Sequence, residues 1–174
     1  METMILQIFQ REVERQCRFA LIAIEDLRQA LKTSDSDSIW YSIQAFLVAA
    51  GNISKLLWPS QARLPERGAE LRESLSISDE SPLEPRKFRN HFEHFDERLE
   101  KWATSLEPRM FIDSNIGTGK IIKGPQQKNF LRNFDTANFA VTFRGDVYHL
   151  QPVANAIRDL WQKASAEAQK PRSD

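Results

Sequence analysis

The sequence predicts a mainly α-helical bundle with a small β-hairpin insert before the last helix. Apolar residues recur at three- and four-residue steps through most of the chain, and this is the spacing of one helix face. After Pro108, short β-branched and aromatic runs replace that spacing. A length of 174 residues suits one domain with one core. We therefore expect a single domain over residues 1–174, with the β insert at 109–150 within it.

Two long helices are expected at the start of the chain. The first covers about residues 4–32. The second follows the run SDSDS at 34–38, which offers several N-cap side chains, and it should stop before Pro59. A short helix is expected at 66–75. The stripes of the two long helices consist of Leu6, Phe9, Val13, Cys17, Ala20, Ile24, Leu27 and Leu31, then Ile39, Ile43, Phe46, Leu47, Ala50, Ile53 and Leu57.

A third long helix is predicted from a capping signal and a strict apolar alternation. The run Ser81-Pro82-Leu83-Glu84 has the form of a capping box with proline at the first helical position. We therefore expect the helix to begin there. Its stripe is Phe88, Phe92, Phe95, Leu99, Trp102 and Leu106.

The end of the chain combines a hairpin with a final helix. MFID, NFAVTF and VYHL are strand-like runs, and the last two flank Arg144-Gly145-Asp146 as a tight turn. Pro152 is expected to open the final helix. The apolar face of that helix is Val153, Ile157, Leu160, Trp161 and Ala164.

Composition excludes several classes of protein. Lysine plus arginine equals aspartate plus glutamate at 24 each, so any polyanion site must be local. A single cysteine, Cys17, rules out an internal disulfide and a cysteine-based metal cluster. Since no paired-acid motif accompanies the three histidines, we expect neither a metal nor a cofactor. No apolar run has the length of a membrane span or a signal-peptide core, so we expect a cytoplasmic protein without membrane attachment.

The segment RKFRNHFEHFDERLEKW at 86–102 is the main candidate site, because it holds two of the three histidines. On an ideal helix Asn90, His91 and His94 share one flank, and Arg98 joins them. Arg89 lies on the other flank, roughly 140° from His94. Histidine exchanges protons near neutral pH and arginine binds phosphate through a planar, permanent charge. The alternative is a solvated helix face with ion pairs at four-residue spacing.

The run Arg89-Asn90-His91-Phe92-Glu93-His94 has the form arginine, polar residue, three more residues, histidine. It resembles the motif of the HEPN superfamily of α-helical proteins. The resemblance implies a bundle that forms a homodimer, and many members are metal-independent RNases of toxin or defence systems. It assigns proton transfer to His94, stabilisation of phosphate charge to Arg89 and orientation to Asn90. A dimer would bring two such helices face to face, and an antitoxin protein is an expected partner.

Two alternatives stay open for this motif. Arg86 and His91 have the same spacing as Arg89 and His94, although Lys87 is then in the polar position. Some HEPN proteins are non-catalytic, so the chain is alternatively a dimeric module that binds a nucleotide, RNA or a partner protein. The chain has Phe95-Asp96 after His94, whereas nucleotidyltransferase-linked members of the family often carry a tyrosine two places after the histidine.

A second candidate site is the basic segment TGKIIKGPQQKNFLRNF at 118–134. It has no acidic residue, and its cations are interleaved with Phe130 and Phe134. Such a surface binds single-stranded RNA through phosphate contacts and base stacking. The alternative is a solvated loop with its phenylalanines tucked beneath it. The predicted RNA-binding residues are Lys120, Lys123, Lys128 and Arg132.

Overall fold

The computed structural model describes residues 2–60, 63, 66–85, 94–105, 111–117 and 129–170. The chain divides into two compact units. One comprises Met1–Arg86 with Pro152–Asp174, and the other is Lys87–Gln151. The described residues form five helices and one four-stranded sheet, so the mainly helical class is confirmed.

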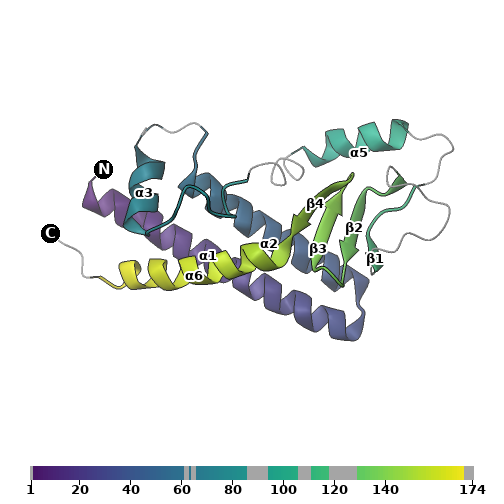
Figure 1. The fold of residues 1–174 in the computed structure, drawn as a ribbon, viewed down its shortest axis with the longest axis horizontal. Helices are drawn as coiled ribbons and strands as arrows, with labels where there is room; N and C mark the ends of the chain where they lie inside the picture. Colours follow the sequence, from purple (N-terminus) through teal and green to yellow (C-terminus); the bar gives the residue numbers. More distant parts are fainter. Residues whose placement is uncertain are drawn as a thin grey trace. The chain divides into compact units, whose positions relative to one another are not determined.

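The first unit is built on a helical hairpin, α1 (Thr3–Thr33) and α2 (Ser36–Leu57). Ser34 ends α1 in the left-handed region with φ 55°. Asp35 caps α2, because its carboxylate accepts from the N–H groups of Asp37 and Ser38. The second helix ends at Leu57, before Pro59 as expected. Figure 1 shows the two helices running side by side in opposite directions.

Two further helices pack on this hairpin within the first unit. Helix α3 (Arg67–Ser74) confirms the short helix expected near 66–75. Helix α6 (Leu150–Ala168) starts two residues before Pro152, and the proline is tolerated there because first-turn N–H groups have no intrahelical partner. The unit's core includes Val13, Cys17, Ala20, Ile24 and Leu27 of α1, Ile39, Ile43, Phe46, Ile53 and Leu57 of α2, Leu71 of α3, and Val153, Ile157, Leu160 and Ala164 of α6.

Polar contacts fix the register of these helices. Asn52 donates to Gln16 at 3.2 Å, which ties α2 to α1. The indole N–H of Trp161 donates to Glu14 at 3.2 Å and ties α6 to α1. Gln10 donates to Ser74 at 3.1 Å and ties α1 to α3. Each is a part-buried bond between residues far apart in sequence, so together they specify one packing arrangement.

The expected start of the third long helix is wrong. Residues 81–85 form a turn in which the N–H of Glu84 donates to the carbonyl of Ser81 at 3.0 Å, and no helix begins there. The reason is Pro85, because a proline disfavours helical geometry at the residue before it. Residues 86–93 lie outside the described part of the chain. Helix α5 (Phe95–Thr104) is the helix of this region that the structure describes.

The second unit contains α5 and a sheet that is larger than the predicted hairpin. Its strands are β1 (Asn115–Gly117), β2 (Arg132–Asp135), β3 (Ala140–Phe143) and β4 (Asp146–His149), in that spatial order. Strands β1 and β2 are parallel, and the other pairs are antiparallel. The expected turn is present, with φ 48° at Arg144 and 90° at Gly145, which are values of a type I′ hairpin. Among its described residues, the buried apolar side chains are Trp102, Leu131, Phe134, Ala140, Val141, Phe143 and Leu150.

Candidate functional site

His94 is the residue of the predicted catalytic set that the structure describes. It is the N-cap residue of α5, with φ −118° and ψ 41°. The expectation of one continuous helix through His94 is therefore wrong, because these angles are not helical. Arg89 and Asn90 lie outside the described residues, as do Arg86 and His91 of the alternative register. The 140° separation expected of Arg89 and His94 on one helix consequently no longer applies.

The imidazole of His94 is exposed and lies beside a carboxylate. Its side chain is 55% exposed, and Nδ1 lies 3.5 Å from Oε1 of Glu97. A carboxylate at this distance from Nδ1 can accept a hydrogen bond from the imidazole.

The start of α5 combines a helix N-terminus with two acidic side chains, Asp96 and Glu97. The carbonyl of His94 accepts from the N–H of Arg98 at 3.2 Å, so α5 begins its hydrogen-bond ladder at His94. The first N–H groups of a helix and its dipole favour negative charge at that end. Arg98 follows one turn later, and its Nε is buried without a hydrogen-bond partner among the described residues. The backbone of His94 and that of Arg98 are thus joined one turn apart.

Arg132 is the described member of the predicted RNA-binding set, and it is engaged within the second unit. Its guanidinium binds both carboxylate oxygens of Asp113, with Nε to Oδ1 at 2.8 Å and Nη2 to Oδ2 at 2.5 Å. Its Cζ also lies 5.1 Å from the centre of the Phe95 ring. Burial alone would raise the pKa of Asp113, but the hydrogen bonds and charge of Arg132 outweigh it and hold that pKa below its usual range. Lys120, Lys123 and Lys128 lie outside the described residues.

The two aromatic residues of the basic segment differ in how deeply they are buried. Phe134 is fully buried in β2 and meets Phe139 edge to face at 5.7 Å, so it is not accessible to a nucleobase. Phe130 is half-buried and forms an isolated bridge with Ile112. Phe111, which the sequence did not single out, is 44% exposed and lies edge to face on Trp102 at 5.1 Å.

Two residues that make contacts in this region were not predicted from the sequence. Glu97 follows His94 by three residues, and this helical spacing was a sufficient signal for their contact. Asp113 is 19 residues from Arg132, and no local pattern relates them. Phe95 links the two places, because it follows His94 in the chain while its ring lies under Arg132 and against Phe143.

Comparison with known proteins finds no matching protein family, curated protein or solved structure. Within the described ranges, no group of three or more histidine, cysteine, aspartate or glutamate side chains has an arrangement that fits a metal ion. None of the helices in those ranges is both long and apolar enough to cross a membrane.

Proposed function

We propose that the chain is a cytoplasmic, metal-independent endoribonuclease of HEPN type, related to the RNases of toxin and defence systems. The observation that carries the proposal is the exposed imidazole of His94 beside Glu97 at the start of α5. In this proposal His94 transfers a proton during attack of a ribose 2′-hydroxyl on the adjacent phosphate. Arg89 stabilises the phosphate charge and Asn90 orients it.

Each described neighbour of His94 bears on this chemistry in a different way. Glu97 stabilises the imidazolium that forms when His94 accepts the proton. The first N–H groups of α5 are donors for a phosphate oxygen, and the acidic first-turn residues Asp96 and Glu97 oppose its charge. The phosphodiester bond to the leaving 5′-oxygen breaks as the 2′-oxygen bond forms. The leaving oxygen takes a proton from the His94 imidazolium or from water, so the products are a 2′,3′-cyclic phosphate and a 5′-hydroxyl. No redox partner is needed, and the basic residues Lys120, Lys123, Lys128 and Arg132 would hold the rest of the strand.

Cleavage of single-stranded RNA in excess EDTA tests the proposal. We expect a 2′,3′-cyclic phosphate end, and a loss of about 10²-fold or more in His94→Ala. Glu97→Gln should lose less, because it removes the charge of the group that faces Nδ1 and keeps a hydrogen-bond acceptor there. His149→Ala is the matched control, since His149 is an exposed histidine on β4. Equal activity of wild type and His94→Ala would contradict the assignment, and a selective loss in His91→Ala would move the site to Arg86 and His91.

A composite site formed by two copies has its own test. If Arg89 and His94 act across a twofold dimer, mixing inactive Arg89→Ala with inactive His94→Ala should restore part of the activity, because one of the two sites in a mixed dimer is then intact. Absence of restoration would assign both residues to one chain.

The second candidate is a non-catalytic dimeric module that binds a nucleotide, RNA or a partner protein such as an antitoxin. The engagement of Arg132 with Asp113 favours a nucleotide or a partner protein over RNA as the ligand, because that guanidinium is already paired. The zero net charge favours the second candidate as well. Binding of RNA by a wild-type protein that never cleaves it would support this function over the first.

A further inference from the structure

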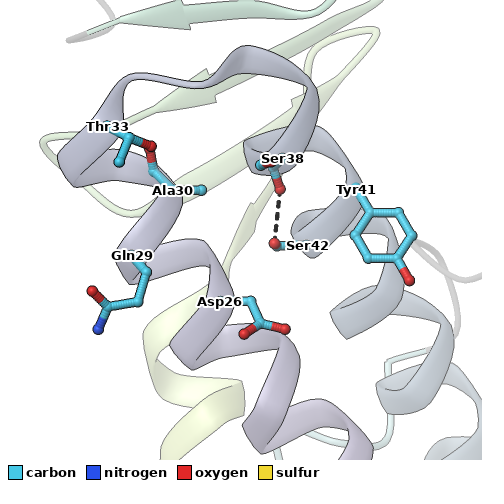
Figure 2. Close-up of a pocket in the computed structure, with 7 residues that line it drawn as sticks. All are labelled: Asp26, Gln29, Ala30, Thr33, Ser38, Tyr41 and Ser42. Atoms are coloured by element: carbon cyan, nitrogen blue, oxygen red, sulfur yellow. Dashed lines mark hydrogen bonds between the residues drawn. The ribbon is translucent and has the colours of Figure 1, made fainter.

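A surface pocket lies between the C-terminal end of α1 and the N-terminal end of α2 (Figure 2). Its volume is about 380 Å³, which is within the range of small-molecule sites. Ala30 and Ser42 are buried and form its floor, and Ser42 is only 2% exposed. The exposed residues around this floor are Asp26, Gln29, Thr33, Ser38 and Tyr41.

The serine and threonine hydroxyls of the pocket already donate their hydrogens within the protein. Thr33 Oγ1 donates to the carbonyl of Ala30 at 3.0 Å. Ser42 Oγ donates to the carbonyl of Ser38 at 2.7 Å, and Ser38 Oγ donates to Oδ2 of Asp35 at 2.6 Å. A hydroxyl has one hydrogen and two lone pairs. Each of these oxygens can therefore bind a further group only as an acceptor.

Asp26 adds a negative charge to these acceptors. Its carboxylate has no hydrogen-bond or ion-pair partner among the residues that the structure describes. None of the described lining residues is a lysine or an arginine. Lys32 donates to Oε1 of Gln29 at 2.9 Å, and Nε2 of the same amide donates to Glu25 at 2.7 Å. The amide of Gln29 is thus engaged, and Lys32 has an acidic neighbour of its own.

This set of groups favours a cation that is rich in donors. A primary ammonium has three N–H donors, no acceptor and a full charge, so it can bond to a carboxylate and to hydroxyl oxygens at once. A bare divalent ion requires six or more oxygen ligands, and the described lining offers a single carboxylate. The volume also leaves room for an alkyl chain, with Ala30 and the ring of Tyr41 as apolar lining.

We propose that this pocket binds the primary ammonium group of a small aliphatic amine, with the Asp26 carboxylate as its counter-ion. The hydroxyl oxygens of Ser38 and Ser42 accept the remaining N–H groups. The pocket lies in the first unit, whereas His94 and Arg132 belong to the second. Amine binding is therefore independent of the proposed RNA cleavage.

Titration of the whole chain with cadaverine, followed by nitrogen–proton correlation NMR without RNA, tests the proposal. Wild type should show saturable shifts confined to the end of α1 and the start of α2. Pentanediol, which has hydroxyls in place of the ammonium groups, should cause none at the same concentration. Shifts spread over the whole surface, or equal binding of pentanediol, would overturn the proposal. Displacement of cadaverine by an equal concentration of magnesium chloride would also overturn it, because the pocket would then be a metal site.

Substitutions in the pocket test the two kinds of acceptor. Asp26→Asn should raise the Kd for cadaverine about tenfold or more, because it removes the charge and keeps the shape. Ser42→Ala should raise it roughly threefold, the effect of one neutral hydrogen bond. Asp159→Asn makes the same change at an exposed position of α6 and should leave Kd unchanged. Circular dichroism checks that each variant is folded, and an unchanged Kd in folded Asp26→Asn would exclude the site.

A lysine side chain of another protein carries the same ammonium group, and a second ligand separates the two sources. Acetyl-lysine amide with a free side-chain amine presents that group on a peptide backbone. Tighter binding of cadaverine would identify a free amine as the ligand, and tighter binding of the lysine derivative would identify a protein side chain. Binding of neither would exclude an ammonium site.

Discussion

The guanidinium of Arg132 holds the carboxylate of Asp113 through two parallel hydrogen bonds. Asp113 lies two residues before β1, and Arg132 opens β2, so the pair joins the start of an edge strand to its parallel neighbour. The side chains are only 21 and 31% exposed. A bidentate pair with this much burial is stronger than an ordinary surface pair.

Arg132→Ala should loosen β1 selectively. The change leaves the Asp113 carboxylate partly buried without its partner, which costs about 1–3 kcal/mol. Amide hydrogen exchange should accelerate at Asn115–Gly117 and in β2. Arg15→Ala removes an exposed pair within α1 and should cost less than about 1 kcal/mol. Unchanged protection of β1 in Arg132→Ala would show that the pair does not hold the strand.

The Asp113 pair also gives the sheet a pH dependence at the acid end. The pKa of Asp113 lies below its ordinary value of 3.8 in the folded chain. The stability that it contributes is therefore present above pH 3.8 and is lost as the pH falls through the folded value. In Asp113→Asn the free energy of unfolding should no longer show the decrease that comes from protonating Asp113.

Gly68→Ala should destabilise the first unit although alanine is the better helix former. A Cβ at Gly68 would lie 2.6 Å from Cδ of Pro59 and 2.8 Å from the carbonyl oxygen of Leu57. The clash involves backbone and a rigid ring, so α3 must move away, at a cost of about 1–3 kcal/mol. The thermal midpoint and the urea midpoint should both fall. Gly117→Ala is the control, because a Cβ there meets no atom within 4 Å, and an equal loss in both variants would contradict the packing argument.

A helix could be predicted from the sequence where its apolar stripe is long or where no residue nearby opposes its capping signal. The stripe of α1 repeats over the whole of Thr3–Thr33, and Asp35 supplies a strong cap for α2. The start of the third helix was not predictable from its capping box alone. Pro82 favours a first helical turn while Pro85 opposes its continuation, and the chain forms a turn at 81–85.

Contacts between distant segments account for what the sequence did not reveal. Strand β1 has three residues and no alternating pattern, and its parallel pairing with β2 joins segments 18 residues apart. Such a pairing depends on tertiary packing rather than on local propensity. The same holds for Asp113 and Arg132, whereas Glu97 was readable from its spacing to His94. Of the predicted site, His94 and Arg132 are placed by the structure, and their functions stay predictions.

Tyr148 should make stability fall at alkaline pH. Burial raises the pKa of Tyr148 from 10.0 to about 12. The neutral phenol is thus favoured by folding, and the stability that it contributes is complete below pH 10 and is lost as the pH rises through about 12. Tyr148→Phe should remain more stable than wild type as that window is crossed, by an amount on the order of 2 kcal/mol at its upper end. Absorbance at the phenolate band in Tyr41→Phe, where Tyr148 is the remaining tyrosine, reports the ionisation directly. A midpoint near 10 in the folded protein would show that Tyr148 is solvated and would remove the alkaline effect.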